Sequence, residues 1–223
     1  MTARHPRVVI VDYGMGNRRS VFKALERVGA SPVLGRTHRD LVAARALVIP
    51  GVGAFPEAMK RLDELDLTEP IRDRARQGVP VLGICLGMQL LLERSQEMGD
   101  TAGLGLIPGQ VTWLEAGGLR VPHIGWNEVE LVASSPLTDG LPASAFYHVH
   151  SLVARPANGA DVIGVSEYGE RFATILGRGT VFGVQFHPEK SSIGGLALLE
   201  RFIALSRTAA TDSPARLARI GQS

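Results

Sequence analysis

The sequence predicts an α/β fold in which a mixed, mostly parallel sheet is flanked by helices. Three short apolar runs rich in β-branched residues, at 8–11, 46–49 and 81–84, are each followed by a turn and a helical stretch. Such uninterrupted runs are typical of parallel strands that are buried on both faces and connected by helices. The 223 residues, of which 45% are hydrophobic, suit one large domain with a substantial core.

Helices are expected where charged or apolar-faced stretches follow these strands. The segment Pro50-Gly51-Val52-Gly53 breaks the second strand, and glycines end several of the helical stretches. The expected helices cover residues 20–28, 56–65, 67–77 and 86–97.

The second half of the chain predicts antiparallel additions to the sheet. Strand-like segments are separated by Gly, Pro and Asn turns, at 110–114, 123–132, 145–154, 161–167, 171–176 and 180–186. An apolar-periodic helix is expected at 193–205 to close the fold. We therefore expect one domain over residues 6–207, followed by a polar, mobile tail over 208–223.

Composition argues against several classes of function. Lys and Arg total 24 and Asp and Glu total 22, a formal charge of +2, so no nucleic-acid partner is expected. The longest mostly apolar stretch, 79–92, is shorter than the about 20 residues of a membrane span, and no secretory segment is expected. The one cysteine, Cys85, excludes an internal disulfide. No Cys/His spacing predicts a metal site, and a reducing cytoplasm is the expected compartment.

Cys85 lies in the segment Gly83-Ile84-Cys85-Leu86-Gly87, at the expected junction of a strand and a helix. In this pattern a sharp turn exposes one side chain at the top of the sheet, and small residues two positions away let the backbone close up. A thiol at a helix N-terminus is favoured as the thiolate. A lone Cys is otherwise a small buried hydrophobe, but a core strand gains nothing from the two glycines. The pattern therefore predicts a nucleophile.

A base, and a residue that orients it, are supplied by the segment 182–189. An apolar strand is expected to end at His187, and Pro188 favours extended backbone there. Residues i and i+2 of extended backbone project to one side, so Glu189 can fix the tautomer of the imidazole. The alternative is a strand-end turn with a solvated Glu.

An acyl-transfer site also needs hydrogen-bond donors for an oxyanion. The backbone N–H of Leu86 is one candidate because it directly follows the nucleophile. The second candidate is a loop whose glycines permit unusual peptide orientations, formed by Gly51, Val52 and Gly53. An ordinary strand-to-helix turn also explains this loop. A lone Gly-x-Gly at 14–16 is weak evidence for a dinucleotide site, so no cofactor is expected.

The motifs resemble those of a known family. Residues 83–89 (GICLGMQ) and 185–189 (QFHPE) are similar to two signatures of class I, triad-type glutamine amidotransferases. Further blocks resemble the glutaminase subunits of imidazole glycerol phosphate synthases: 11–17 (VDYGMGN), 50–53 (PGVG), 103–109 (GLGLIPG), 122–127 (PHIGWN) and 186–191 (FHPEKS). The resemblance implies a three-layer, flavodoxin-like fold.

The resemblance further implies hydrolysis of L-glutamine to glutamate and ammonia. Cys85 would attack the side-chain amide to form a γ-glutamyl thioester, and His187, oriented by Glu189, would protonate the departing ammonia and then activate a water. Gln89 is implied to hold the α-amino or carboxylate end of the substrate, although a polar residue satisfied by loop backbone explains it equally well. Backbone contacts to the glutamine carboxylate are implied from Ser151 and Leu152.

A partner is implied as well: a (β/α)8-barrel cyclase subunit that forms a heterodimer with this chain and consumes the ammonia. Its products would be imidazole glycerol phosphate, for histidine biosynthesis, and an aminoimidazole carboxamide ribonucleotide. The residues expected near that interface are Asn17, Arg18, Pro122, Trp126 and Lys190. A core position for Trp126 and a solvated charge for Lys190 are the alternatives.

Three positions depart from the family pattern. His148 and Leu152 replace aromatic residues within 147–152, and Arg18 stands where Leu is usual; none of them belongs to the triad. The flexible 50–53 loop predicts a glutaminase that is poorly active until its partner binds. The alternative functions are a glutaminase for another synthase, such as pyridoxal phosphate or guanylate synthesis, and a non-catalytic binding module on the same fold.

Overall fold

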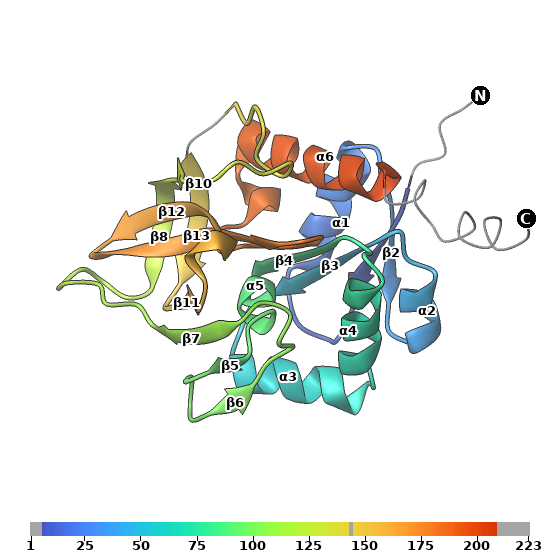
Figure 1. The fold of residues 1–223 in the computed structure, drawn as a ribbon, viewed down its shortest axis with the longest axis horizontal. Coiled ribbons are helices and arrows are strands. Elements are labelled where there is room, and N and C mark those ends of the chain that lie inside the picture. Colours follow the sequence, from blue (N-terminus) through green and yellow to red (C-terminus); the bar gives the residue numbers. More distant parts are fainter. Residues whose placement is uncertain (1–5, 143–144, 209–223) are drawn as a thin grey trace, which may run out of the picture.

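The computed structural model describes residues 6–142 and 145–208, and the predicted α/β fold is present in them (Figure 1). The larger sheet has a parallel half with the strand order β2-β1-β3-β4-β14. These strands are β1 (Arg7–Val11), β2 (Ser31–Gly35), β3 (Ala46–Gly51), β4 (Val81–Cys85) and β14 (Val181–Val184). Because β3, β4 and β14 are parallel, the loops that follow them leave the sheet at the same edge, where ligands bind in open α/β sheets.

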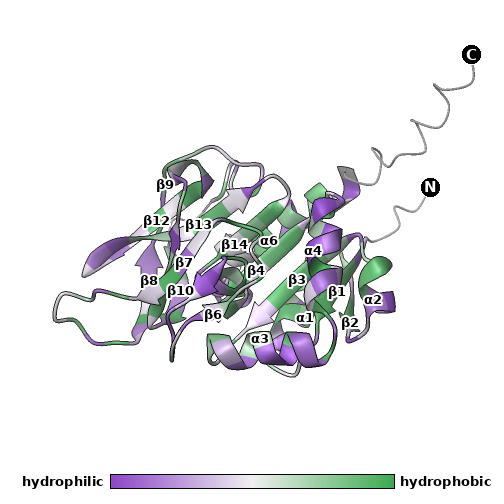
Figure 2. Cartoon of the chain, turned by 60° about the horizontal axis from the view of Figure 1, so that its bottom comes forward, coloured by the Kyte–Doolittle hydropathy of each residue, from purple (hydrophilic) through white to green (hydrophobic). Residues whose placement is uncertain are grey.

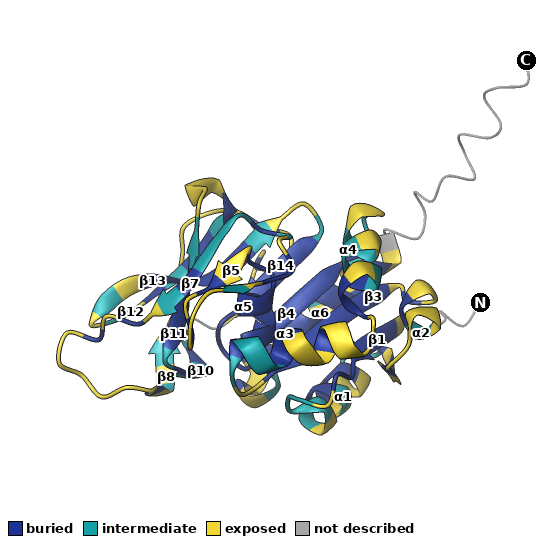
Figure 3. Ribbon diagram, turned by 90° about the horizontal axis from the view of Figure 1, so that it is seen from below, coloured by how far each residue is buried: buried dark blue, intermediate teal, exposed yellow. Residues whose placement is uncertain are grey.

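Helices cover both faces of this parallel half (Figure 1). One face packs against α1 (Arg18–Arg27) and α6 (Ser192–Thr208). The other packs against α2 (His38–Val42), α3 (Phe55–Glu64), α4 (Thr68–Arg76) and α5 (Leu86–Leu90). In β1, Val8 and Ile10 point to the first face and Val9 and Val11 to the second. The apolar runs are uninterrupted because both faces of these strands are buried. The central strands are largely hydrophobic in Figure 2 and largely buried in Figure 3.

Further strands, which include the predicted antiparallel additions, extend the sheet beyond β14. They are β13 (Glu170–Arg178), β11 (Leu152–Pro156), β7 (Gly109–Trp113), β5 (Arg94–Ser95), β6 (Thr101–Ala102), β12 (Val162–Tyr168) and β9 (Glu130–Leu131). Each pairs with its neighbour in antiparallel fashion except β5, which is parallel to β7. A second sheet pairs β8 (His123–Glu128) with β10 (Ala145–His150). Two 3₁₀ turns, η1 (Gly159–Asp161) and η2 (Pro188–Lys190), complete the described elements.

The sequence interpretation did not include β2, α2, β5 or β6, and β5 lies in the segment that was expected to be helical. The strand β2 contains Pro32 and Gly35, which are unfavourable in strands, and it has β1 as its one partner because it forms the edge of the sheet. The helix α2 has only five residues and depends on a capping box between Thr37 and Asp40.

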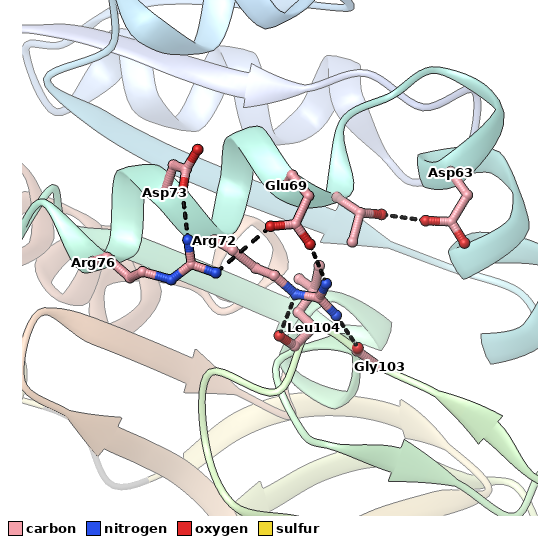
Figure 4. Close-up of polar contacts among 8 residues, drawn as sticks. Asp63, Glu69, Arg72, Asp73, Arg76, Gly103 and Leu104 are labelled. Carbon is pink, nitrogen blue, oxygen red and sulfur yellow. Dashed lines mark hydrogen bonds and ion pairs between the residues drawn. The ribbon is translucent and has the colours of Figure 1, made fainter.

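The helix expected over 86–97 is shorter than predicted and ends at Leu90. The carbonyl of Leu90 accepts a hydrogen bond from the backbone N–H of Leu104 instead of continuing the helix. Arg72 of α4 holds that loop, because Nε donates to Leu104 O at 2.9 Å and Nη2 to Gly103 O at 3.0 Å (Figure 4). A contact between residues distant in the sequence therefore ends α5, and the local pattern of apolar residues cannot predict this end.

Two segments expected as single strands, 123–132 and 145–154, each divide into two strands that join different sheets. The helix expected at 193–205 is present as α6. Of the tail expected at 208–223, residues 209–223 lie outside the described part of the chain. No helix in the described residues is long and apolar enough to cross a membrane.

Candidate active site

Cys85 has the backbone conformation of a strained turn between β4 and α5. Its φ is 55° and its ψ −112°, a region that costs a non-glycine residue of order 1–3 kcal/mol. The flanking glycines allow the turn, because a Cβ at Gly83 would lie 2.4 Å from Gly87 O and a Cβ at Gly87 would lie 1.8 Å from Ile49 O. The sharp turn expected from the sequence is therefore present, with Cys85 at its apex.

His187 follows β14, and the η2 turn brings Glu189 back against it. His187 Nδ1 lies 2.9 Å from Glu189 Oε1, and the two side chains are 3% and 1% exposed. Burial lowers the pKa of His187, but hydrogen bonds and charge attraction from Cys85 and Glu189 outweigh it and raise the pKa to about 9. The imidazole beside the thiol is therefore held in its protonated form at neutral pH.

Glu189 has a second partner that the sequence interpretation assigned elsewhere. Asn17 Nδ2 donates a hydrogen bond of 3.3 Å to Glu189 Oε1, the oxygen that also faces His187. The other oxygen, Oε2, is buried and has no hydrogen-bond partner among the described residues. Asn17, predicted at the partner interface, is thus also part of the polar surroundings of the triad.

A cavity of about 320 Å³ lies in front of Cys85. The predicted site residues that line it are Val52, Gly53, Cys85, Leu86, Gln89, Pro122, Ser151, Leu152, His187 and Lys190. The residues that line it without having been predicted are Glu97, Trp113, Val149 and His150. The structure therefore brings Cys85 and His187, part of the candidate oxyanion loop and the predicted substrate contacts to one cavity, and Gly51 is not among its lining residues.

Gln89 uses both hydrogens of its amide inside the protein. Its Nε2 donates to Leu152 O and to Gln185 Oε1, each at 3.1 Å, and the side chain is buried. Among its amide atoms only Oε1 remains for a substrate, and an oxygen can only accept hydrogen bonds. The geometry therefore favours a role toward the ammonium group rather than the carboxylate of an amino acid.

Glu97 lines the cavity, and no sequence motif indicates it as a site residue. It follows β5, in a segment that had been expected to be helical, and it is 9% exposed. Its Oε2 accepts a 2.6 Å hydrogen bond from Phe55 N, at the first residue of α3. A carboxylate in this position is stabilised by the helix N-terminus, and Glu97 is also one of the residues that line the cavity.

The candidate oxyanion loop follows β3 directly. Gly51 pairs with Cys85 in the sheet, and a Cβ at Gly51 would lie 2.7 Å from the Cβ of Leu86. Tyr13 donates a 2.6 Å hydrogen bond to the carbonyl of Pro50, and burial raises the pKa of this phenol. Gly53 has a φ of 108°, which suits glycine, and Val52 is exposed. The loop is thus held at Pro50, the residue before it, and is open to solvent at Val52.

The residues predicted at the partner interface have different surroundings. Trp126 is 55% exposed and packs edge-on against Tyr147, whose ring also lies 5.8 Å from Lys190 Nζ. Pro122 follows a cis peptide bond on the cavity rim. Arg18 forms an ion pair with Asp12. The core alternative for Trp126 is therefore wrong.

His148, a departure from the family pattern, is a buried core residue. Its Nδ1 lies 3.0 Å from Phe146 O and its Nε2 lies 2.8 Å from Thr174 Oγ1. Burial lowers the pKa of His148 to about 3, so the ring is neutral. In the described part of the chain, no group of His, Cys, Asp and Glu side chains could hold a metal ion.

Comparison with known proteins identifies the class of protein to which this fold and site belong. The sequence profile described as "Glutamine amidotransferase class-I" matches residues 9–205, so the chain is a member of the class I glutamine amidotransferases. Within that class, the chain belongs to the family of imidazole glycerol phosphate synthase subunits HisH. It is 48% identical to that subunit of Moorella thermoacetica, over 91% of this chain and 96% of the relative. It is 47% identical to that of Aquifex aeolicus, over 88% and 95%.

Solved structures with lower sequence identity share the fold. A glutamine amidotransferase crystal structure superposes with a TM-score of 0.70 at 24% identity, covering 89% of this chain and 98% of that one. The structure of PurLQS from Thermotoga maritima superposes with a TM-score of 0.71 at 18% identity, covering 92% and 99%. The predicted fold class, a layered α/β sheet with antiparallel additions, is confirmed by these neighbours.

Proposed function

We propose that this chain is the glutaminase subunit of an imidazole glycerol phosphate synthase, with Cys85, His187 and Glu189 as its catalytic triad. The observation that carries the proposal is the buried pair of His187 and Glu189 at 2.9 Å, whose imidazole interacts with a thiol held on a strained turn. A thiolate next to an imidazolium is the activated nucleophile of acyl-transfer enzymes.

In the proposed reaction, the Cys85 sulfur attacks the side-chain amide carbon of glutamine. His187 gives its proton to the amide nitrogen, the carbon–nitrogen bond breaks, and ammonia leaves with a γ-glutamyl thioester remaining on Cys85. The same imidazole then takes a proton from water, which attacks the thioester and releases glutamate. Glu189 keeps the ring in one orientation throughout.

The proposed orientation of the substrate follows from the hydrogen-bond acceptors and donors among the residues that line the cavity. Gln89 Oε1 and the Glu97 carboxylate are acceptors, and we assign them to the α-ammonium group of glutamine. The backbone N–H groups of Ser151 and Leu152, with the charge of Lys190 on the rim, are assigned to the α-carboxylate. The substrate amide then points to Cys85.

The tetrahedral intermediate of this reaction carries a negative oxygen that needs donors. The backbone N–H of Leu86, at the first residue of α5, is one proposed donor. The second comes from the loop of Gly51, Val52 and Gly53, whose exposed middle residue lets a partner change the direction of its peptides.

The proposed partner is a (β/α)8-barrel cyclase that receives the ammonia. We further propose that residues 6–207 of this chain form a single amidotransferase domain and that the protein works in the cytoplasm. The proposed contact surface for the cyclase surrounds the cavity mouth and includes Asn17, Arg18, Pro122, Trp126 and Lys190. The exposed Trp126 supports this assignment, since aromatic residues are enriched at the cores of protein interfaces.

Glutamate release by the purified chain, alone and with the cyclase and its nucleotide ligand, tests this proposal. We expect strong activation by the cyclase and a loss of at least about a thousandfold in Cys85→Ala. Equal rates with and without the cyclase would contradict the expected activation by the partner. Unchanged partner-dependent hydrolysis in Cys85→Ala would contradict the catalytic assignment and favour the non-catalytic alternative. Copurification of a different synthase would favour the alternative pathway.

A further inference from the structure

Gln185 is a buried residue that contacts the sulfur of Cys85. It directly follows β14, is fully buried, and its Nε2 lies 3.8 Å from Cys85 Sγ, within hydrogen-bond range for sulfur. Its backbone N–H donates to Thr174 O at 2.9 Å, which continues the sheet for one more residue. Residues i and i+2 of extended backbone project to one side, so Gln185 and His187 both face the thiol.

The direction of the Gln185 amide is fixed by its neighbours. Leu152 O is a backbone carbonyl that can only accept, so the group of Gln89 that lies 3.1 Å from it must be the amide nitrogen. The second hydrogen of that nitrogen points to Gln185 Oε1 at 3.1 Å. Gln185 therefore presents its oxygen to Gln89 and its N–H to the sulfur.

The carbonyl that anchors this chain of hydrogen bonds is itself held in place. His150 Nδ1 lies 3.0 Å from Leu152 O and must carry the proton, so Nε2 of the neutral ring is an acceptor. His123 Nδ1 lies 3.0 Å from that nitrogen and donates to it, and Asn127 Nδ2 faces the remaining nitrogen of His123 at 3.3 Å. Leu152 O therefore accepts hydrogen bonds from both His150 and Gln89, and from Gln89 the donors continue through Gln185 to the nucleophile.

The two protonation states of Cys85 have different partners in this arrangement. As a thiol, Sγ can donate to Val149 O at 3.6 Å. As a thiolate it has no proton to donate, and a sulfur anion next to a carbonyl needs donors to compensate. The donors available to it are the His187 imidazolium and the Gln185 amide.

We propose that Gln185 is a further catalytic residue of this site, whose buried amide donates to the Cys85 sulfur and stabilises the thiolate. The proposal rests on the role of Cys85 as the nucleophile. Gln89 then has a second function besides lining the substrate cavity, because it fixes the direction of the Gln185 amide.

Alkylation of Cys85 by iodoacetamide across a range of pH tests this proposal directly. Cys85 is the one cysteine of the chain, so the rate reports a single site. In Gln185→Leu we expect the midpoint of the rate–pH profile to rise by about one pH unit, with alkylation about tenfold slower below the midpoint. A purely structural role for Gln185 would change the rate by the same factor at every pH.

Further variants separate loss of folding from loss of the donor. Gln185→Met keeps the side-chain length and removes the donor, and it should shift the midpoint as Gln185→Leu does. Gln89→Leu leaves residue 185 intact but frees its amide to turn, so a smaller shift in the same direction is expected. The matched control is Gln96→Leu, an exposed amide that donates to Gln110 Oε1, with an unchanged profile expected.

The outcomes also separate this proposal from the function on which it rests. A folded Gln185→Met or Gln185→Leu variant with the wild-type midpoint would overturn the role of Gln185, while partner-dependent glutamine hydrolysis by the wild-type chain would leave Cys85 as nucleophile. Hydrolysis that survives in Cys85→Ala would overturn the proposed function itself.

Discussion

Asn17 and Glu189 are 172 positions apart in the sequence, and Asn17 Nδ2 donates a 3.3 Å hydrogen bond to Glu189 Oε1. The contact joins the residue before α1 to the carboxylate that orients His187. Asn17 was predicted at the partner interface, so one residue is now placed next to both the triad and the proposed docking surface. A partner that touches Asn17 would act one hydrogen bond away from Glu189.

Asn17→Ala should lower kcat for glutamine hydrolysis at saturating cyclase. The variant removes a hydrogen bond to a charged group, worth about 1.5 kcal/mol, so a reduction of about tenfold is expected. Steady-state kinetics at several cyclase concentrations separates the two roles of Asn17. A rise in the dissociation constant for the cyclase with an unchanged kcat would restrict Asn17 to the interface.

Gly87→Ala should prevent the correct formation of the turn at Cys85. Its Cβ would lie 1.8 Å from Ile49 O, so α5 would have to move away from β3. We expect a loss of several kcal/mol in the free energy of unfolding, measured by urea denaturation, and loss of glutaminase activity. The matched control is Gly159→Ala, where nothing lies within 4 Å and φ is not positive. That variant should stay within about 1 kcal/mol of the wild type, and equal stability of the two variants would contradict the steric argument.

The parts of the fold that the sequence predicts are those with local signals. The runs at 8–11, 46–49 and 81–84 are strands because burial on both faces demands uninterrupted apolar residues. The end of α5 at Leu90 was missed because its cause is distant in the sequence. Backbone N–H groups of the loop at 103–107, which Arg72 holds, donate hydrogen bonds to the carbonyls of residues 90–92. The strand β2 was missed because an edge strand tolerates Pro and Gly.

The site residues also divide into those with local sequence signals and those that only the fold brings to the site. Cys85, His187 and Glu189 lie in short motifs whose spacing has a geometric meaning, and the structure brings all three together. Glu97 lies in no such motif, and only the packing of its loop against α3 brings it to the cavity. Gln185 is part of the motif at 185–189, but its proposed role depends on Gln89, whose orientation only the folded chain defines.

His148 and Thr174 form a buried pair that double-mutant analysis can measure. His148→Phe leaves the Thr174 hydroxyl without its imidazole partner, and we expect a loss of about 1–3 kcal/mol in the free energy of unfolding. Thr174→Val in the His148→Phe background should recover part of that loss, because both polar groups are then gone. Additive effects of the two substitutions in urea denaturation would show that the pair has no coupling.

Acid should destabilise the protein through its buried histidines. Burial lowers the pKa of His148 and of His150 from 6.5 to about 3, so between these values the unfolded chain binds protons that the folded protein does not. Stability therefore falls as pH drops below about 6.5, by up to about 1.4 kcal/mol per pH unit for each ring.

The same linkage predicts how a variant should respond. His148→Phe removes one of the histidines whose pKa burial lowers, so its unfolding free energy, determined by urea denaturation from pH 7 to pH 5, should decline less steeply than that of the wild type. His187 contributes the opposite trend at high pH, because its raised pKa of about 9 means that its stabilisation is lost as pH rises from 6.5 through 9. Parallel curves for wild type and His148→Phe in the acid range would contradict the neutral, buried state of His148.

Intact-mass spectrometry of the chain, quenched in acid during glutamine turnover with the cyclase, tests the central claim most directly. A fraction of the wild-type protein should carry a γ-glutamyl group on Cys85, and Cys85→Ala should carry none and release no glutamate. Glutamate released at the wild-type rate by Cys85→Ala, with no adduct on either protein, would contradict the account.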